Sequence, residues 1–159
     1  YFQGRDNTAL NATTGLTIQA WVNSDSNSQS GHIFEKGAVN TQYSMFLSGS
    51  TMYFRTYGTS VNDLTVAATS VCPSGTWALV TCTYDGSNKR IYKNGTQVAS
   101  AAITGTLSTN TGGTWIGCYG TAADYFWDGK IASVRAYDRA LSVAEIKNNF
   151  RSQRNRFRV

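Results

Sequence analysis

The sequence predicts an all-β protein of antiparallel strands that ends in one short helix. Residues 77–98 alternate apolar and polar side chains with a period of two, which is typical of strands. This stretch contains Asn94-Gly95, a strong hairpin signal, because a type I′ turn needs positive φ at both central residues. Near the end of the chain, Ser142 and Glu145 have the spacing of a capping box, which indicates the start of a helix.

The composition fits one aromatic-rich β domain. The chain has 159 residues, of which 13% are aromatic and 14% charged, and it contains a single proline. A chain of this length is expected to form one domain, which we place at residues 5–150. No apolar run reaches the ~20 residues of a membrane-spanning helix, so we expect no membrane insertion. Residues 1–4, Tyr-Phe-Gln-Gly, resemble the remainder of a cleaved purification tag, which leaves the natural start open.

The positive charge of the chain is concentrated at its C-terminal end. The formal net charge is +5, and Arg151, Arg154, Arg156 and Arg158 account for four of these charges. We therefore expect residues 151–159 to be a basic, mobile tail that leaves a nearly neutral domain. A nucleic-acid footprint should cover a face of the domain, so nucleic acid is not an expected partner.

The first half of the chain predicts a series of short strands. In residues 16–22, Leu16, Ile18 and Val22 share one face, and Trp21 falls on the opposite face. The Trp21 ring is either a platform for stacking a sugar or a ring covered by a neighbouring loop. Further strands are expected at residues 33–37, 42–48, 51–57 and 64–68.

The strand at residues 51–57 carries a candidate binding surface. Met52 and Phe54 occupy one face, and Tyr53, Arg55 and Tyr57 occupy the other. Tyrosines beside an arginine suit stacking on sugar rings and hydrogen bonding to hydroxyls. The same pattern also fits a cross-strand aromatic ladder that only stabilises the sheet.

The second half of the chain completes the sheets. Strands are expected at residues 77–84, 90–93, 96–99, 99–103, 113–118 and 130–137, followed by a helix at residues 143–150. The loop between the last two strands combines aromatic rings with carboxylates. Its chemically important residues are Tyr119, Asp124, Tyr125, Trp127 and Asp128.

Two separated strings of the sequence resemble a known superfamily. They are WALVTCTYDGSNKRIYKNG at residues 77–95 and WDGKI at residues 127–131. They resemble the laminin G-like, concanavalin A-like lectin/glucanase superfamily, and the resemblance covers about residues 16–150. It implies a jelly-roll β-sandwich of two antiparallel sheets, in which Trp21 and Trp127 are framework residues. It does not fix a function, because this superfamily includes lectins, adhesion modules and glycosidases.

The acidic residues predict that the protein is not an enzyme. A glycosidase needs two carboxyl groups flanking the scissile bond. The only glutamates are Glu35 and Glu145, and Glu145 is already assigned to the helix cap. The laminarinase-type enzymes of the superfamily use a Glu-x-Asp-x-x-Glu motif, which this sequence lacks. His32, the only histidine, is interpreted as an exposed turn residue, and no catalytic residue is predicted.

Calcium is a candidate ligand. Ca²⁺ takes oxygen ligands that are often contributed by loops distant in sequence, and many laminin G-like domains bind it at a rim of the sandwich. The candidate ligands are Asn62 and Asp63 in one loop and Asp124 and Asp128 in another. The sequence lacks a dense acidic cluster, so a calcium site and its absence both stay open.

The three cysteines cannot all pair within one chain. Cys82 alternates in phase with Val80 and Tyr84, which predicts a small buried apolar residue. A disulfide between Cys72 and Cys118 stays open, because nothing in their spacing supports it. Reduced thiols without bound metal are the default expectation.

Recognition of a glycan by aromatic residues is the predicted function. We expect a non-catalytic carbohydrate-binding or adhesion module of a larger secreted or virion-surface protein. The candidate ligand-binding residues are Tyr125, Asp124, Tyr119, Trp127, Tyr53, Arg55 and Tyr57.

A structural role in a viral particle is the alternative. The end of the sequence, from Glu145 to Phe157, resembles the ends of laminin G-like domains in phage and other viral structural proteins. In that interpretation the module decorates or assembles a particle without binding sugar. Residues 151–159 would then dock on other subunits. Both interpretations predict an extracellular or virion-surface location.

Overall fold

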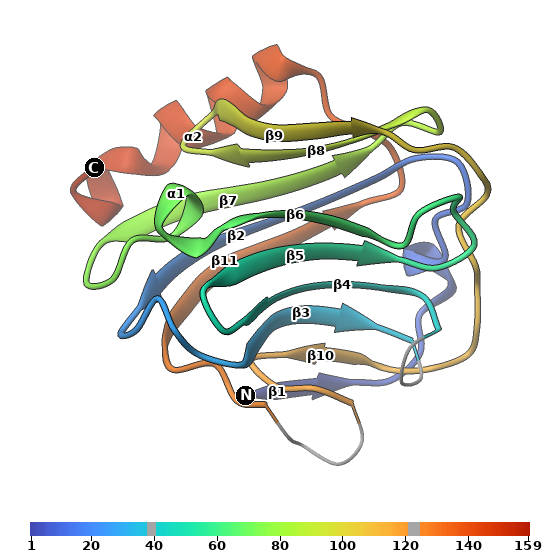
Figure 1. The fold of residues 1–159 in the computed structure, drawn as a ribbon, viewed down its shortest axis with the longest axis horizontal. Helices are drawn as coiled ribbons and strands as arrows, with labels where there is room; N and C mark the ends of the chain where they lie inside the picture. Colours follow the sequence, from blue (N-terminus) through green and yellow to red (C-terminus); the bar gives the residue numbers. More distant parts are fainter. Residues whose placement is uncertain (38–40, 121–124) are drawn as a thin grey trace.

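The chain forms two stacked antiparallel sheets in a computed structural model that describes residues 1–37, 41–120 and 125–159 (Figure 1). The six-stranded sheet contains, in spatial order, β1 (Phe2–Gly4), β10 (Thr114–Ile116), β3 (Gly31–Lys36), β4 (Tyr43–Ser48), β5 (Thr51–Thr56) and β6 (Asp63–Ala67). The five-stranded sheet contains β11 (Gly129–Tyr137), β2 (Leu16–Ser24), β7 (Trp77–Tyr84), β8 (Asn88–Lys93) and β9 (Thr96–Ala102). The predicted all-β sandwich with one C-terminal helix is confirmed.

Two short helical turns and one longer helix complete the described structure. The 3₁₀ turn η1 (Thr8–Leu10) precedes β2, and α1 (Ala68–Val71) follows β6. The helix α2 (Val143–Phe157) follows β11. None of the described helices combines the length and the apolar character that a membrane-spanning helix needs.

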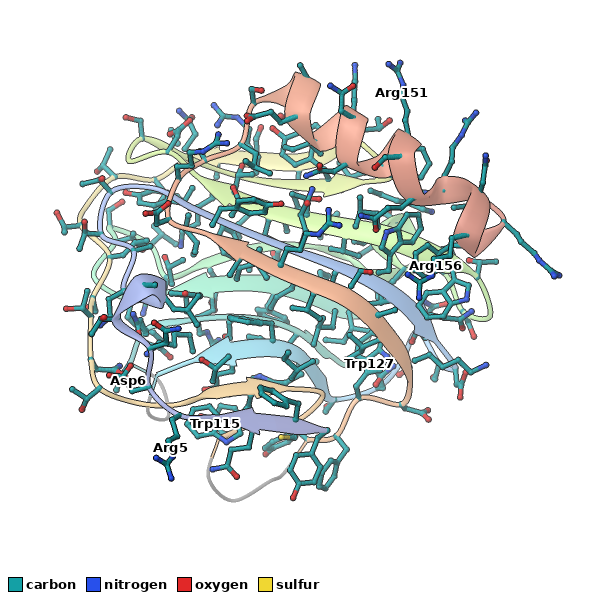
Figure 2. All side chains as sticks on the ribbon, turned by 180° about the vertical axis from the view of Figure 1, so that it is seen from behind. Arg5, Asp6, Trp115, Trp127, Arg151 and Arg156 are labelled. Atoms are coloured by element: carbon teal, nitrogen blue, oxygen red, sulfur yellow. The ribbon has the colours of Figure 1, made fainter. Side chains whose placement is uncertain are left out.

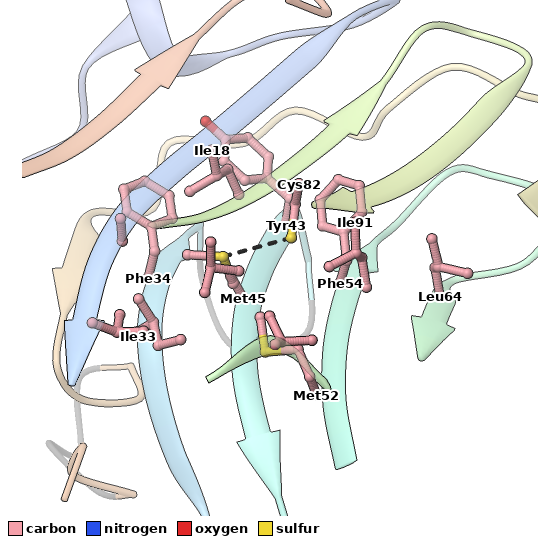
Figure 3. Close-up of a cluster of buried hydrophobic side chains, with 14 of the residues drawn as sticks. Ile18, Ile33, Phe34, Tyr43, Met45, Met52, Phe54, Leu64, Cys82 and Ile91 are labelled. Carbon is pink, nitrogen blue, oxygen red and sulfur yellow. Dashed lines mark hydrogen bonds between the residues drawn. The ribbon is translucent and has the colours of Figure 1, made fainter. Parts of the chain in front are cut away.

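The core lies between the two sheets and follows the predicted alternation. Ile18 and Ile91 of the five-stranded sheet meet Met45 and Phe54 of the six-stranded sheet, and all four side chains are fully buried (Figure 3). In β2, alternate residues such as Leu16, Ile18 and Val22 supply the core, because successive side chains point to opposite faces.

The hairpin between β8 and β9 has the predicted turn. Asn94 has a φ of 51° and Gly95 a φ of 82°, as a type I′ turn requires. The residues after the turn form one strand, β9 (Thr96–Ala102), where the sequence predicted two short ones. The first strand, β1, pairs with β10, so the tag-like residues extend the edge of the six-stranded sheet.

The helix α2 corrects the prediction for the C-terminal end. It begins at the predicted capping box, with both reciprocal hydrogen bonds between Ser142 and Glu145 present. It does not end at Phe150 but continues to Phe157, so residues 151–157 are helical and do not leave the domain as a tail. Figure 2 shows α2 lying across the five-stranded sheet, with the side chain of Arg151 pointing away from that sheet.

The outer face of the five-stranded sheet is covered by this helix. Trp21 is fully buried, and its ring stacks on Phe157 with a centroid distance of 4.1 Å. The indole Nε1–H of Trp21 donates to Gln153 Oε1 at 2.8 Å. Trp21 is thus covered, as the superfamily resemblance implied, but by the helix and not by a loop.

The three cysteines are buried and free in the structure. Cys82 lies in the core as predicted, with its Sγ 3.5 Å from Met45 Sδ across the two sheets (Figure 3). Cys72 also belongs to the main core cluster. Cys72 and Cys118 do not form the disulfide that the sequence left open.

Candidate functional site

A cleft of about 310 Å³ lies on the six-stranded sheet, mainly over the face that points away from the core. Strands β3, β4 and β5 form its floor, and the segment between β10 and β11 contributes two tyrosines. The lining residues that matter for the chemistry are His32, Glu35, Gln42, Phe46, Arg55, Tyr57, Tyr119 and Tyr125.

A β-bulge in β3 brings two polar residues to this cleft. Ile33 is an extra residue between the pairs that His32 and Phe34 make with β4. In a regular strand His32 and Glu35, three positions apart, would point to opposite faces. The extra residue resets the alternation, so that Ile33 and Phe34 both enter the core while His32 and Glu35 both line the cleft.

Stacked rings build one side of the floor. The His32 and Phe46 rings lie 4.6 Å apart with an interplanar angle of 3°, and Phe46 stacks on Tyr53 at 4.9 Å. These three residues are cross-strand neighbours on β3, β4 and β5. The guanidinium of Arg55 lies 5.0 Å from the Phe46 ring centre, within the range of a cation–π contact. The rings are therefore stacked face to face across the three strands, and pairing between the strands holds them in place.

Two tyrosines from the segment after β10 form the opposite wall. The Tyr119 ring lies 4.6 Å from the His32 ring and 5.8 Å from the Tyr125 ring. Tyr125 has a φ of 49°, an uncommon conformation for a bulky residue. Its carbonyl accepts the backbone N–H of His32 at 3.0 Å, and its side chain is 54% exposed. The strained backbone thus fixes an accessible aromatic ring beside the cleft.

Several buried polar atoms of the cleft have no hydrogen-bond partner. Of the six such side-chain atoms in the described residues, three belong to the lining: His32 Nδ1, Glu35 Oε2 and Gln42 Oε1. The first two are 3.4 Å apart, longer than a good hydrogen bond between such groups. Buried polar groups normally have partners, so these atoms indicate a place where another molecule completes the hydrogen bonding.

The arginine of the cleft is neutralised by a neighbouring carboxylate. Arg55 Nε and Nη2 donate to the two carboxylate oxygens of Asp63 at 2.7 and 2.8 Å. This bidentate pair spans β5 and β6, on which the two residues are directly opposite each other. Hydrogen bonding to Asp63 raises the pKa of Arg55 above the ordinary value of an arginine. Tyr57 also hydrogen-bonds the guanidinium.

Burial keeps the pair His32 and Glu35 uncharged near neutral pH. Desolvation raises the pKa of Glu35 to about 8, although the backbone N–H of Gly120 and the charge of Arg55 act in the opposite direction. Desolvation and the Arg55 charge lower the pKa of His32 to about 3. At pH 7 the cleft therefore presents a carboxylic acid beside a neutral imidazole.

Four of the predicted ligand-binding residues line this one cleft, although they come from two distant segments of the chain. They are Arg55, Tyr57, Tyr119 and Tyr125. The sequence placed them in two separate candidate surfaces, and the fold brings those surfaces together.

The other predicted ligand-binding residues lie elsewhere. Tyr53 stacks against Phe46 at the edge of the floor and is not part of the lining. Trp127 is buried in the main core cluster, where the chain enters β11 (Figure 2). Its position fits the framework role that the superfamily resemblance implied. Asp124 lies outside the described residues.

The sequence analysis missed part of the lining. His32 was interpreted as an exposed turn residue, but it is a buried member of β3 with 6% exposure, so that interpretation is wrong. Glu35 was considered only as a catalytic acid, and Gln42 and Phe46 were given no role. Two polar residues three positions apart in a short strand, His32 and Glu35, are the signal of the bulge that could have revealed the site.

Of the predicted calcium ligands, Asn62, Asp63 and Asp128 lie among the described residues, and Asp124 does not. Asp63 is engaged by Arg55, and the backbone carbonyl of Asn62 accepts Lys89 Nζ at 2.7 Å. Asp128 hydrogen-bonds through its backbone to the loop before β3, where Gln29 Nε2 donates to its carbonyl at 2.9 Å. Within residues 1–37, 41–120 and 125–159, no group of three or more His, Cys, Asp or Glu side chains has the arrangement of a metal site.

Comparison with known proteins assigns the fold. The sequence matches the family described as the concanavalin A-like lectin/glucanases superfamily over residues 1–147. A search of curated proteins found no match.

Solved structures with a similar fold include three bacterial domains. Domain 4 of an extracellular arabinanase from Geobacillus stearothermophilus, in complex with arabinotriose, aligns with a TM-score of 0.67 and 18% identity over 92% of this chain and 70% of the other. The binding domain of Paraclostridial Mosquitocidal Protein 1 gives a TM-score of 0.65 and 16% identity over 96% and 41% of the two chains. A putative carbohydrate-binding protein from Bacteroides ovatus gives a TM-score of 0.64 and 16% identity over 91% of this chain and 45% of the other. The chain thus spans less than half the length of the last two proteins.

Proposed function

The chain belongs to the concanavalin A-like lectin/glucanase superfamily, and we propose that it is a non-catalytic carbohydrate-binding module whose ligand occupies the cleft over β3, β4 and β5. The observation that carries this proposal is the lining itself. Buried polar atoms without partners, His32 Nδ1, Glu35 Oε2 and Gln42 Oε1, lie among aromatic rings.

This combination matches the chemistry of a sugar. A pyranose or furanose ring has apolar faces that stack on aromatic side chains and hydroxyl groups that both donate and accept hydrogen bonds. The rings of His32 and Phe46 and the opposite wall of Tyr119 and Tyr125 supply aromatic surface. The volume of about 310 Å³ falls in the lower part of the range of small-ligand sites.

Structures of similar fold support the same interpretation. The arabinanase domain from Geobacillus stearothermophilus holds arabinotriose, and the Bacteroides ovatus protein is described as a putative carbohydrate-binding protein. Their identity to this chain is below 20%, so they support the class of ligand and not its identity. The arabinanase domain is an extracellular module, which supports a secreted or surface-displayed parent protein for this chain.

The carboxyl groups of the cleft support a binding role over catalysis. Glycoside hydrolysis requires two carboxyl groups flanking the bond that is cleaved. Among the described residues, Glu35 lines the cleft, and the nearby Asp63 is held by Arg55 in a bidentate pair. A carboxylate in such a pair is a poor acid or nucleophile, because its charge is already compensated.

The experiment is a glycan array with a matched pair of variants. Tyr125 and Phe126 are adjacent and similarly exposed, at 54% and 52%, but only Tyr125 lines the cleft. Tyr125→Ala should weaken binding by at least about tenfold, which is the loss of one stacking contact, and Phe126→Ala should bind as the unaltered protein does. The absence of binding to any displayed glycan, or equal losses in both variants, would overturn the proposal.

The same array tests the calcium prediction. It is run once with calcium and once with a chelator. Binding that disappears with the chelator would assign a calcium requirement and direct attention to Asp128 and Asp63. Binding that is unchanged by the chelator would place recognition in the cleft residues alone.

A further inference from the structure

We propose that His32 and Glu35 together hold one hydroxyl group of an uncharged sugar, and that the cleft therefore selects neutral over acidic saccharides. This inference rests on the proposed function and names the class of sugar.

The geometry of the pair fits a bridging hydroxyl. The side chains of His32 and Glu35 are 8% and 5% exposed, and their facing atoms Nδ1 and Oε2 are 3.4 Å apart without a hydrogen bond. A hydroxyl oxygen placed beside this pair can lie within about 2.8 Å of both atoms. A hydroxyl also donates one hydrogen bond and accepts others, so it satisfies a donor and an acceptor at the same time.

The protonation of the pair supplies one donor and one acceptor. The backbone N–H of Gly120 donates to the Glu35 carboxyl group, and Oε2 has no partner. With the pKa of Glu35 at about 8, the neutral acid carries its proton on the oxygen that faces His32 and the ligand. In the tautomer that carries its proton on Nε2, the neutral imidazole of His32 accepts at Nδ1, the nitrogen that faces Glu35. The sugar hydroxyl can therefore accept from Glu35 and donate to His32.

The charges around the cleft leave no excess positive charge for an acidic sugar. The described cations of the lining are Arg55 and Lys36. Arg55 is held by both oxygens of Asp63, and Lys36 Nζ donates to Asp6 Oδ1 at 2.8 Å and to the Gly112 carbonyl at 2.7 Å. A ligand carboxylate would enter a cavity whose cations are already compensated, and it would lose its hydration without gaining a counter-ion.

The groups that face Glu35 do not titrate near pH 8. They are His32 on the same strand, whose pKa is lowered to about 3, Arg55 on β5, Tyr57 after β5, and Cys118 and Tyr119 after β10. The pKa values of Tyr57, Cys118 and Tyr119 are all raised, chiefly by burial, and Arg55 stays charged. Lys89, whose pKa is lowered to about 8, also titrates in this window, so the part of the change in sugar binding between pH 7 and 9 that Glu35→Gln removes reports on Glu35.

The test compares pairs of oligosaccharides that differ only at C6. Polygalacturonate fragments and the same fragments after reduction of their carboxyl groups, and glucuronate oligomers with their carboxyl-reduced counterparts, are titrated against the unaltered chain by calorimetry at pH 7. The neutral member should bind at least about tenfold more tightly. Between pH 7 and 9 the affinity should fall, because the sugar would cover an ionised and desolvated carboxylate. Glu35→Gln keeps an uncharged donor of the same shape, so it should bind without this pH dependence, and Glu35→Ala should bind at least tenfold more weakly.

The outcomes separate this inference from the proposed function. If the chain binds glycans but prefers the acidic member of each pair, or if its affinity for neutral sugars does not change from pH 7 to 9, the inference is overturned and the carbohydrate-binding function stands. If the chain binds none of these sugars and none on the array, the proposed function fails and this inference fails with it. Circular dichroism of Glu35→Gln and Glu35→Ala confirms that each variant is folded.

Discussion

The ring of Phe157, two residues before the C-terminal Val159, stacks on the ring of Trp21 in the second strand at a centroid distance of 4.1 Å and an interplanar angle of 16°. Phe150 lies on the other side of the same tryptophan at 5.9 Å. This contact joins the last turn of α2 to the five-stranded sheet. The last turn of α2 therefore belongs to the packed domain.

Phe157→Ala should destabilise the domain by about 3 kcal/mol, as a large-to-small substitution in a packed cluster does. Phe157 is 7% exposed and also contacts Trp77, so the substitution uncovers two tryptophans. Urea unfolding followed by tryptophan fluorescence measures the change. Arg151→Ala, on the exposed side of the same helix, is the control and should change stability by less than about 0.5 kcal/mol. Equal stability of the two variants would contradict the packed end of α2.

Ser142→Ala should cost about 1 kcal/mol, because it removes the side chain that caps the first turn of α2. Ser142 Oγ accepts the backbone N–H of Glu145, and Glu145 Oε2 accepts the backbone N–H of Ser142. Thermal unfolding by circular dichroism measures the loss. Ser152→Ala, also on α2 and exposed, removes a hydroxyl that caps no helix end, and it should leave the melting temperature nearly unchanged. A larger loss in Ser152→Ala than in Ser142→Ala would refute the cap.

The stability of the domain should fall as the pH rises from 6.5 to 8. The pKa of Glu35 is raised from 4.5 to about 8 by burial, so in this window the unfolded chain has released the proton that the folded chain keeps. Unfolding then becomes easier by up to about 1.4 kcal/mol per pH unit. His32 contributes little there, because its pKa is lowered to about 3 and its effect is a loss of stability below pH 6.5.

Glu35→Gln provides the matched comparison for this pH dependence. The variant has no titrating group at this position. Its free energy of unfolding minus that of the unaltered chain should therefore rise steadily from pH 6.5 to 8. Lys89, whose pKa is lowered to about 8, is present in both proteins and cancels in the difference. Urea unfolding at four pH values measures this difference. A constant difference would show that Glu35 is ionised in the folded state.

The thiols should be unreactive in the folded protein. Cys72, Cys82 and Cys118 are fully buried. Burial raises the pKa of Cys72 to about 12 and raises those of the other two as well, which removes the reactive thiolate at neutral pH. A thiol-reactive dye should label none of the three in native buffer and all of them in guanidinium chloride. Rapid labelling of a native cysteine would contradict this burial.

The candidate site shows why sequence reasoning found only half of it. Arg55, Tyr57, Tyr119 and Tyr125 were recognised because aromatic and polar residues on one strand face or in one loop are visible locally. Their union in one cleft depends on the sheet order, which places β10 beside β3 and β3 beside β4. The alternation of a strand contains no information about which strands become neighbours.

The sequence by itself determined the features that arise from contacts within a few residues. The period-two alternation placed Leu16, Ile18 and Val22 on one strand face, which is the face buried in the core, and the Asn94-Gly95 pair set the turn at positive φ. The spacing of Ser142 and Glu145 set the start of α2. Each of these follows from local geometry, in which backbone dihedrals and neighbouring side chains decide the outcome.

Only the tertiary structure decided which polar groups form the site and where the helix ends. The bulge at Ile33 turns His32 and Glu35 to the same face, and their burial depends on rings from β4 and from the segment after β10. The continuation of α2 to Phe157 depends on its packing against Trp21. Burial and the resulting pKa shifts arise from surroundings that are distant in sequence, so they appear only once the chain has folded.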